Sequence, residues 1–367
     1  MSRTERGATT AAGAGDELNV LVVGTFGGGG IHSYIDEQVN QLDGLVRVRT
    51  HDMRAPPVGS GRLRAVQGLL LGLVAFVQFL FRRPADVVHV HTSHRFSFYR
   101  ASPYVFFARY VWRRPVVLHV HGSAFDDFVL TRSQAVGALQ QLVFRASDEV
   151  IVLSEYWKDV VSHRVEREKI RVIPNAVRPD VFPVDDERTT PHVVFVSNLI
   201  ERKGVLELVS AVERLSDRAS GDFEVTIAGD GPLSASVERL ADEYDEVTYL
   251  GYVSEERKRT LLRDGSIYVL PTYAEGLPIA LLEGMAGGNA VVSTAVGSIP
   301  EVIDECNGIL VEPGEVDELA DALAELITDR HRRARMAERN RELIETRYSW
   351  DRVRTELVNA YRSNTGS

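Results

Sequence analysis

Short apolar runs alternate with helical segments along this chain, and the alternation occurs twice. In the first half, strands are predicted at residues 18–24, 46–50, 87–91, 116–121, 149–153 and 170–173, with a first helix over 31–42. In the second half, strands are predicted at residues 192–197, 224–228, 247–250, 267–270, 290–293 and 308–311. Strands separated by helices indicate parallel sheets with helices on both faces. The sequence therefore predicts an α/β protein with two doubly wound domains.

Composition places the boundaries of these domains. Residues 1–17 carry Ala, Gly, Thr and charge without an apolar core, which predicts a disordered tail and not a signal peptide. We expect an N-terminal domain over 18–183, which ends in a linker rich in proline and acid (174–187), and a C-terminal domain over 189–346. Open α/β sheets bind ligands at the carboxyl ends of their strands. Two such domains that face each other would place a site in the cleft between them.

The charge of the chain is divided between its halves. Residues 1–183 carry 22 Lys and Arg against 17 Asp and Glu, whereas residues 184–367 carry 20 against 35. Residues 53–125 hold ten arginines and a single acid, Asp86. This division does not fit a general nucleic-acid-binding protein, and local basicity suits an anionic surface or acceptor. The only cysteine, Cys306, allows no internal disulfide and fits a reducing compartment.

The most informative motif is Glu-Gly-Leu-Pro-Ile-Ala-Leu-Leu-Glu at residues 275–283, which follows an apolar run typical of a buried strand. Proline is favoured at the first helical position, so we expect Pro278 to start a helix. The unpaired backbone N–H groups at that helix start form an anion site suited to a phosphate group. Glu275 precedes the helix and Glu283 falls in its second turn. The pattern predicts a carboxylate on each side of a bound diphosphate.

This motif is followed by Gly-Met-Ala-Gly-Gly-Asn-Ala-Val-Val-Ser-Thr at 284–294 and Gly-Ser-Ile-Pro-Glu at 297–301. Together they resemble the donor half of the family 4 retaining glycosyltransferases, also called glycosyl transferases group 1. The resemblance implies GT-B architecture, in which two Rossmann-like domains face each other. It also implies that a C-terminal helix, here expected over 347–364, crosses back to the first domain.

The resemblance also assigns the donor site. Glu283 would hold the ribose diol of a nucleotide-sugar, and Glu275 would hold the donor sugar together with the backbone of Gly276, Leu277 and Pro278. Gly229 and Tyr252 lie in loops that each follow a strand of the second half and would flank the nucleotide. Singly, such loops are ordinary turn sequences.

A further loop of the second half, Ser-Asn-Leu-Ile-Glu-Arg-Lys-Gly at 197–204, follows its first strand. By resemblance, Lys203 would neutralise the leaving diphosphate through charge-assisted bonds. The sequence departs from the family at Asn198, where an arginine is expected. Arg202 is the candidate to replace that arginine, and an ordinary polar loop is the alternative interpretation.

In the first half, Gly-Thr-Phe-Gly-Gly-Gly-Gly-Ile-His at 24–32 lies between a strand and a helix. A dinucleotide fingerprint would need glycine where His32 stands, and Asp52 lies at the distance of its ribose-binding acid. An oxidoreductase is therefore an alternative. The resemblance instead implies that Gly28 and Gly29 let the backbone approach the donor's diphosphate and sugar.

Two histidine pairs end strands of the first half. Alternation places His119 and His121 on one face, and by resemblance His121 lies near the donor's anomeric centre. With Glu275 and Lys203, His121 completes the candidate catalytic set. His89 and His91 also share a face, but no carboxylate partner or metal spacing accompanies them in the sequence.

Residues 65–81 hold 13 apolar side chains, two glycines and two glutamines, bracketed by Arg62, Arg64, Arg82 and Arg83. A membrane span needs about 20 apolar residues, so this stretch is too short. It is either a buried helix or an interfacial helix that its arginines anchor on anionic lipid.

The resemblance and these patterns together imply a retaining enzyme that moves a hexosyl group from a nucleotide-diphosphate sugar to a lipid-linked or glycan acceptor, in polysaccharide or glycoconjugate synthesis. We expect a cytoplasmic protein at the inner membrane face, with no metal or other cofactor and no nucleic-acid partner. Catalysis would be electrostatic, with Lys203 and the helix start stabilising the diphosphate, and covalent attack by Glu275 is the mechanistic alternative. A GT-B nucleotide-sugar epimerase and a non-catalytic nucleotide-sugar-binding subunit, which Asn198 keeps open, are the alternative functions.

Overall fold

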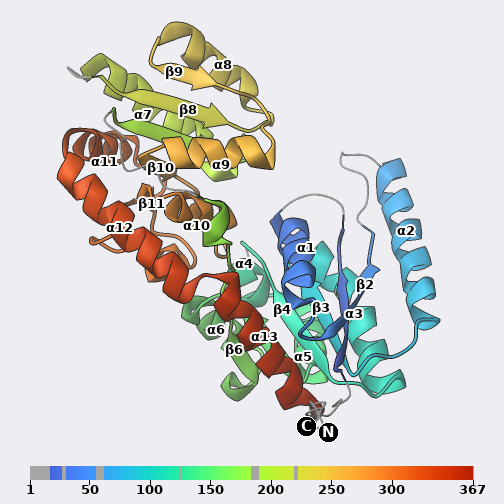
Figure 1. Ribbon diagram of the computed structural model, residues 1–367. Coiled ribbons are helices and arrows are strands. Elements are labelled where there is room, and N and C mark those ends of the chain that lie inside the picture. Colours follow the sequence, from blue (N-terminus) through green and yellow to red (C-terminus); the bar gives the residue numbers. More distant parts are fainter. Residues whose placement is uncertain are drawn as a thin grey trace, which may run out of the picture.

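The computed structural model describes residues 17–26, 30–54, 62–123, 125–182, 190–218 and 222–366. They form two α/β domains, each built on a parallel sheet of six strands, and Figure 1 shows the second domain above the first. Most of the predicted tail over 1–17 lies outside the described residues. The predicted fold class is confirmed.

The first sheet has the strand order β2-β1-β3-β4-β5-β6, and every neighbouring pair is parallel. Its central strands are rich in Val, include three histidines in β3 and β4, and are buried on both faces, as a sheet covered by helices on both sides requires. The strands are β1 (Asn19–Gly24), β2 (Arg47–Asp52), β3 (Val87–Thr92), β4 (Val116–Val120), β5 (Glu149–Val152) and β6 (Ile170–Val172).

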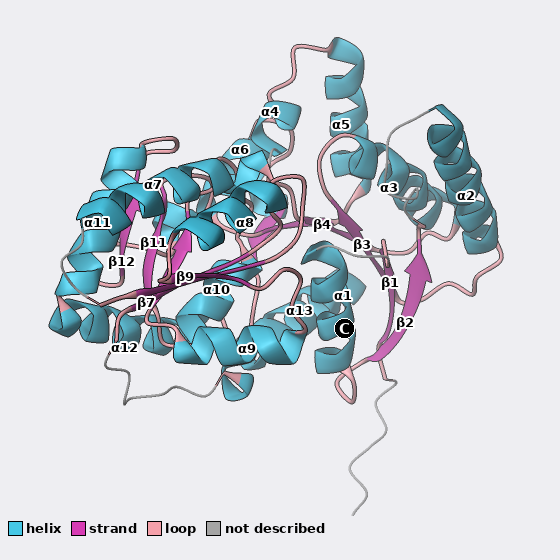
Figure 2. Cartoon of the chain, turned by 90° about the horizontal axis from the view of Figure 1, so that it is seen from above, coloured by secondary structure: helices cyan, strands magenta, loops and turns pink. Residues whose placement is uncertain are grey.

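Helices cover both faces of this sheet, with α1 and α13 on one side and α2, α3 and α5 on the other (Figure 2). Ser133 and Ser154 begin α5 and α6, where each hydroxyl accepts a hydrogen bond from the first turn. The helices of the first domain are α1 (Gly30–Leu42), α2 (Arg62–Leu80), α3 (Phe96–Phe106) with a π-helical turn η1 (Phe107–Val111), α4 (Phe125–Val129), α5 (Gln134–Ala146) and α6 (Glu155–Ser162).

The second sheet has the order β12-β11-β10-β7-β8-β9 and is also parallel throughout. Its strands are β7 (His192–Val196), β8 (Glu224–Ala228), β9 (Val247–Tyr249), β10 (Ile267–Leu270), β11 (Ala290–Thr294) and β12 (Gly308–Val311). Its helices are α7 (Val205–Arg218), α8 (Ser234–Glu243), α9 (Glu255–Asp264), α10 (Ile279–Ala286), α11 (Val316–Thr328) and α12 (Arg330–Arg347). Because β7 and β10 are neighbours, the loops that follow them meet at the carboxyl end of the sheet.

The last helix, α13 (Trp350–Thr365), crosses from the second domain to the first (Figure 1). Trp350, Leu357 and Tyr361 are buried in one cluster with Val22 of β1 and Tyr34 of α1. The helix therefore completes the core of the first domain, as the resemblance implied, although it begins at Trp350 and not at residue 347.

The helix α2 is half-covered rather than buried. Phe79 and Ala75 are fully buried against the sheet, and the ring of Phe79 packs on Trp112 and Tyr104. Its other side is exposed, including Val66, Leu69, Leu70, Leu73, Val74 and Val77, and Phe81 just after it is 85% exposed. The buried-helix interpretation is thus wrong. Among the described residues, no helix is both long and apolar enough to cross a membrane.

Several predicted element ends are shifted by one or two residues, and two of these shifts concern the site. The helix α10 begins at Ile279, because Pro278 has extended dihedral angles and serves as the cap residue whose carbonyl accepts the N–H of Leu282. The strand β4 ends at Val120, although the N–H of His121 still bonds the Thr92 carbonyl oxygen of β3 at 2.8 Å.

Candidate active site

Glu275 lies in the loop between β10 and α10, where it is 6% exposed. Its Oε1 accepts a hydrogen bond from the Thr272 hydroxyl at 3.1 Å, lies 3.4 Å from a guanidinium nitrogen of Arg202, and forms an ion pair with the Lys203 ammonium. Both cations follow β7, so the order of strands in the sheet brings them to Glu275. The structure therefore places Glu275, Lys203 and Arg202 in one constellation at the N-terminus of α10.

The loop that carries these cations is fixed against the loop of Glu275. Arg202 donates to the Ala274 carbonyl oxygen at 2.6 Å, and its own carbonyl accepts the N–H of Tyr273 at 2.8 Å. Gly204 has a φ of +69°, and a β-carbon there would lie 1.8 Å from the Pro271 carbonyl oxygen. Only glycine fits at this position. Asn198, the predicted departure from the family, is exposed at the start of the same loop.

Glu283 lies in the second turn of α10 and pairs with a lysine that was not predicted from the sequence. Lys258 of α9 contacts a carboxylate oxygen of Glu283 at 2.8 Å and Glu255 at 2.8 Å. Burial raises the pKa of Glu283, and the Lys258 charge only partly offsets this effect. Burial would lower the pKa of Lys258, but the two carboxylates outweigh burial and raise it. Glu283 is therefore a largely buried acceptor that is held by Lys258.

The remaining predicted donor residues of the second domain lie at the same carboxyl end of the sheet. Gly229 follows β8 with a φ of +142°, and a β-carbon there would lie 1.8 Å from the Ser197 carbonyl oxygen after β7. Its N–H donates to the Gly251 carbonyl at 2.8 Å. The neighbouring Tyr252 is 83% exposed. The loops after β7, β8 and β9 are thus packed together beside the constellation of Glu275.

The first domain meets this loop directly. A β-carbon on Gly276 would lie 3.2 Å from the carbonyl oxygen of Gly122, the residue after His121. Trp157 of α6 donates its indole N–H to the Gly276 carbonyl at 3.1 Å, and Asn175 donates to the Leu277 carbonyl at 2.6 Å. The structure therefore brings the segment around His121, in the first domain, against the loop that leads into α10 of the second domain.

A cavity of about 610 Å³ opens beside this contact. Its charged lining is acidic and comes from both domains, with Asp126 and Asp127 of α4 on one side and Glu275 and Glu301 on the other. Burial and a hydrogen bond to Asp126 raise the pKa of the Tyr156 hydroxyl, which also lines the cavity, to about 12. The full lining is Ser123, Asp126, Asp127, Tyr156, Trp157, Tyr273, Ala274, Glu275, Ala295, Val296, Gly297, Pro300 and Glu301.

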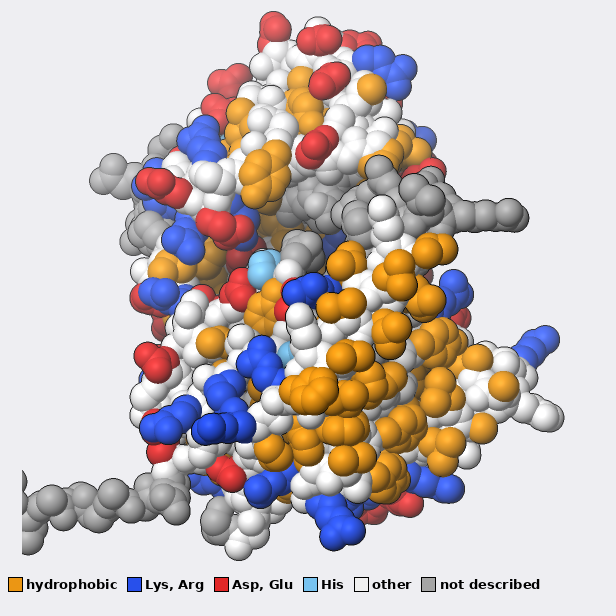
Figure 3. Space-filling model, turned by 90° about the vertical axis from the view of Figure 1, so that its right-hand side faces the viewer, with side chains coloured by type: hydrophobic (Ala, Val, Ile, Leu, Met, Phe, Trp, Pro, Cys, Tyr) orange, Lys and Arg blue, Asp and Glu red, His pale blue; other side chains and the backbone are white. Residues whose placement is uncertain are grey.

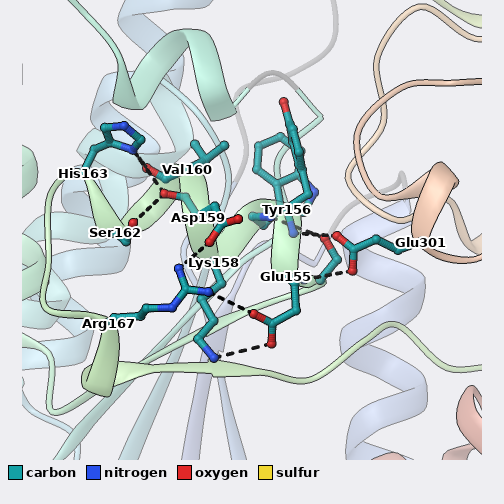
Figure 4. Close-up of polar contacts among 11 residues, drawn as sticks. Glu155, Tyr156, Lys158, Asp159, Val160, Ser162, His163, Arg167 and Glu301 are labelled. Atoms are coloured by element: carbon teal, nitrogen blue, oxygen red, sulfur yellow. Dashed lines mark hydrogen bonds and ion pairs between the residues drawn. The ribbon is translucent and has the colours of Figure 1, made fainter.

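Glu301, the last residue of the motif at 297–301, joins the two domains at the edge of the cavity. Its carboxylate accepts the backbone N–H groups of Glu155 at 3.0 Å and Tyr156 at 2.5 Å, which are the first two residues of α6 (Figure 4). A carboxylate is stabilised at a helix N-terminus because the helix dipole is positive there. The Ser298 hydroxyl also bonds the Ser154 hydroxyl at 2.8 Å. This part of the motif therefore connects the domains.

The two histidine pairs form one buried stack on the face of the first sheet that α1 and α13 cover. His91 Nδ1 lies 2.9 Å from His121 Nε2, and His89 Nδ1 lies 2.7 Å from the Tyr361 hydroxyl of α13. The ring centroids of His119 and His121 are 3.9 Å apart. Burial lowers the pKa values of His89 and His121 to about 3 and those of His91 and His119 well below the ordinary value.

This stack corrects the view of His89 and His91 as an isolated pair. With His119 they bring one nitrogen each within 4.8 Å of the others. The rings, however, stack at interplanar angles of 8° for His89 and His119 and 27° for His89 and His91. Imidazole lone pairs lie in the ring plane, so stacked rings do not direct three of them at one cation. We assign no metal to this group.

Two predictions about the first glycine loop have different outcomes. Gly28 and Gly29 lie outside the described residues, and their role stays a prediction. Asp52 Oδ1 accepts the N–H groups of Phe26 at 3.1 Å and Arg54 at 2.8 Å. It therefore anchors the loops after β1 and β2, and this use of its carboxylate argues against a ribose-binding acid of a dinucleotide site.

The solved structure of HepE from Anabaena in complex with UDP and glucose has the same architecture. It superposes with a TM-score of 0.71 at 18% identity, covering 95% of this chain and 100% of that chain. Two facing doubly wound domains, the crossing α13 and a site at the domain junction define the GT-B fold.

Family models extend this likeness to sequence. Residues 11–181 match the model described as Glycosyltransferase Family 4, and residues 190–329 match Glycosyl transferases group 1. The α-maltose-1-phosphate synthase of Mycolicibacterium smegmatis is 27% identical over 92% of this chain and 95% of its own length. The gpi3 subunit of the Schizosaccharomyces pombe phosphatidylinositol N-acetylglucosaminyltransferase is 29% identical over 77% of this chain and 62% of its length. The chain belongs to the family 4 glycosyltransferases.

Proposed function

We propose that this glycosyltransferase moves a hexosyl group from a nucleotide-diphosphate sugar to a lipid-linked acceptor, with retention of anomeric configuration. The main support for this proposal is the group of Glu275, Lys203 and Arg202 at the start of α10. The segment around His121 packs against this group. The group combines cations, a helix N-terminus and a hydroxyl acceptor within one junction. A sugar diphosphate presents the complementary groups.

The ion pair of Lys203 with Glu275 suggests how the donor binds. Glu275 compensates the charge of Lys203 through this ion pair. A diphosphate at the start of α10 would draw Lys203 and Arg202 to its oxygens, with the first-turn N–H groups of the helix as further donors. Glu275 would then be free to accept hydroxyl groups of the sugar. Two cations and a helix N-terminus would neutralise the charge of the diphosphate, so we propose a reaction that needs no metal ion.

The same contacts bear on the mechanism. With donor bound, Glu275 would keep the hydrogen bond from the Thr272 hydroxyl and accept hydroxyl groups of the sugar, and a carboxylate that accepts several hydrogen bonds is a poor nucleophile. We therefore favour attack of the acceptor hydroxyl on the face that the diphosphate leaves. The departing diphosphate takes the acceptor proton, and Lys203 stabilises the charge that develops on it.

The acidic cavity indicates which part of the acceptor enters the junction. Asp126, Asp127 and Glu301 would repel a phosphate group, whereas carboxylates accept hydrogen bonds from sugar hydroxyls. The reacting end of the acceptor is therefore a neutral polyhydroxyl group. The name of the fission-yeast relative refers to a phosphatidylinositol acceptor and that of the Anabaena structure to UDP and glucose, and both support this assignment of substrate classes.

The exposed side of α2 supports a lipid-linked acceptor. Figure 3 shows hydrophobic side chains gathered into one broad patch on this face of the molecule, with Lys and Arg side chains at its edge. The patch includes Leu69, Leu73 and Phe81, which are 68%, 58% and 85% exposed. Large exposed apolar patches mark interaction sites, and the exposed Arg82 and Arg83 beside Phe81 suit anionic headgroups. We propose peripheral binding to the inner membrane face, with the protein in the cytoplasm.

One assay separates this proposal from its two alternatives. Release of nucleoside diphosphate from a panel of nucleotide-sugars is measured with and without a membrane lipid extract. A transferase releases it only with the extract, and labelled sugar then appears in the lipid fraction. An epimerase releases nucleotide and a modified free sugar without extract, and a binding subunit releases nothing in either condition. Either of these two outcomes contradicts the proposed transfer.

A further inference from the structure

His91 has a contact that the transfer reaction described above does not explain. Its ring is 1% exposed, and its Nδ1 lies 2.9 Å from Nε2 of His121. His121 is only partly buried and precedes Gly122, which contacts the Gly276 loop. His91 therefore contacts His121, the histidine predicted to lie near the donor sugar, from the buried interior of the first domain.

The main chain fixes both ends of this hydrogen bond. β3 and β4 are paired in parallel register, with His91 opposite His119, and the N–H of His121 donates to the Thr92 carbonyl at 2.8 Å. Rings also enclose His121, because the His119 centroid lies 3.9 Å away and the Tyr34 centroid 4.8 Å away. Neighbouring rings thus hold the His121 ring by packing, and the hydrogen bond to His91 sets its orientation.

Burial indicates which nitrogen of each ring carries the proton. His91 Nε2 is buried without a hydrogen-bond partner among the described residues. An unpaired buried N–H is rarer in proteins than an unpaired buried acceptor. His91 therefore carries its proton on Nδ1 and donates it to His121 Nε2. His121, as a neutral ring, then carries its own proton on Nδ1, which is the nitrogen left for a ligand in the cleft.

We propose that His91 is a positioning residue that holds His121 in the Nδ1–H tautomer, so that His121 donates a hydrogen bond to a hydroxyl of the donor sugar. This inference rests on the proposed function and adds a residue to it. His91 would act only through His121, without touching the sugar. The surrounding stack of buried rings keeps both histidines neutral, because burial disfavours the charged form of imidazole.

The experiment compares His91→Leu, which removes the hydrogen bond, with His91→Asn, whose amide nitrogen takes the place of Nδ1. The control is His51→Leu, because His51 is an equally buried histidine of the same sheet whose ring packs on Phe79 and Tyr104 away from the junction. We expect His91→Leu to lower kcat/KM about 100-fold, as misplacement of a reacting group by about 1 Å can. The affinity for free nucleoside diphosphate should stay unchanged, and His91→Asn should recover most of the activity.

Histidine-labelled protein gives a readout that does not depend on transfer activity. The ring nitrogen spectrum, with the His121 signal assigned from its loss in His121→Gln, should show the Nδ1–H form in the wild type and in His91→Asn and a mixture of tautomers in His91→Leu. An Nε2–H form in the wild type overturns the proposal. So does a His91→Leu protein that matches His51→Leu in kcat/KM and keeps a single His121 tautomer. If the wild type transfers no sugar at all, the proposed function fails, while the spectrum still tests the positioning role.

Discussion

Lowering the pH from 7 to 5 should destabilise the first domain through its buried histidines. His89, His91 and His119 are at most 1% exposed. In the unfolded chain each ring takes up a proton near pH 6.5, whereas burial lowers the pKa of His89 in the folded protein to about 3. Burial also lowers the pKa values of His91 and His119 well below the ordinary value. Below pH 6.5 the unfolded state therefore binds more protons than the folded state, so stability falls as the pH falls.

The magnitude follows from these pKa directions. A ring that stays neutral when folded and titrates near 6.5 when unfolded loses about 2 kcal/mol of stability between pH 7 and pH 5. Three such rings lose about 6 kcal/mol, which is comparable to the whole free energy of unfolding of many domains. We therefore expect loss of the folded first domain between pH 6 and pH 5.

Urea unfolding at pH 7, 6 and 5, followed by tryptophan fluorescence, measures this loss. Trp350 reports on the stack, because its ring lies 5.1 Å from Tyr34, which in turn packs on His119. Since carboxylates also titrate in this range, the decisive comparison is with His119→Phe, which should reduce the loss between pH 7 and 5 by about 2 kcal/mol. His331→Phe, at an exposed position on α12, is the control. This prediction is wrong if the unfolding free energy of the wild type changes by less than about 2 kcal/mol between pH 7 and 5, or if His119→Phe shows the same change as the wild type.

Three further perturbations test the donor and membrane sites. Glu283→Ala should weaken nucleotide-sugar binding by about 1.5–3 kcal/mol, because a charged acceptor of the ribose hydroxyls is lost; unchanged affinity by calorimetry in a folded variant contradicts the ribose assignment. Lys203→Ala should lower turnover more than donor affinity. Near-normal turnover at saturating donor would show that another cation stabilises the diphosphate. Arg202→Ala, measured alongside, tests whether that cation is Arg202. In vesicle flotation, the wild type should bind anionic vesicles at low salt and less at high salt, and Arg82→Glu with Arg83→Glu should reduce binding; a wild type that stays unbound at low salt rules out the membrane surface.

Local patterns in the sequence predicted most of the fold. Strands such as β1, β10 and β11 are buried on both faces of parallel sheets, so their sequences are continuously apolar. They can therefore be recognised without knowing which strands they pair with. The motif from Glu275 to Glu283 likewise predicted a carboxylate before and inside a helix. Helix starts and strand ends shifted by one residue, at Pro278 and His121, because their hydrogen bonds depend on neighbouring segments.

Contacts between distant segments were not predictable in this way. Lys258 pairs with Glu283 from another helix, and its sequence context is only that of a charged helix face. The stack of four histidines arises because β3 and β4 are adjacent in the sheet and in register, which spacing along the chain does not reveal. The exposed side of α2 was also undecided, since a uniformly apolar helix carries little information about which of its sides is covered.

The proposed transfer retains the configuration of the donor sugar and takes place at the junction of Glu275 and His121. The most direct test uses a nucleotide-sugar labelled with ¹³C at its anomeric carbon, incubated with the enzyme and membrane lipid extract. The anomeric coupling constant of the lipid-bound product is then measured by NMR. We expect a labelled glycolipid with the same anomeric configuration as the donor, and less of it with Lys203→Ala. A product of inverted configuration, or the absence of any labelled lipid while donor is consumed, would contradict it.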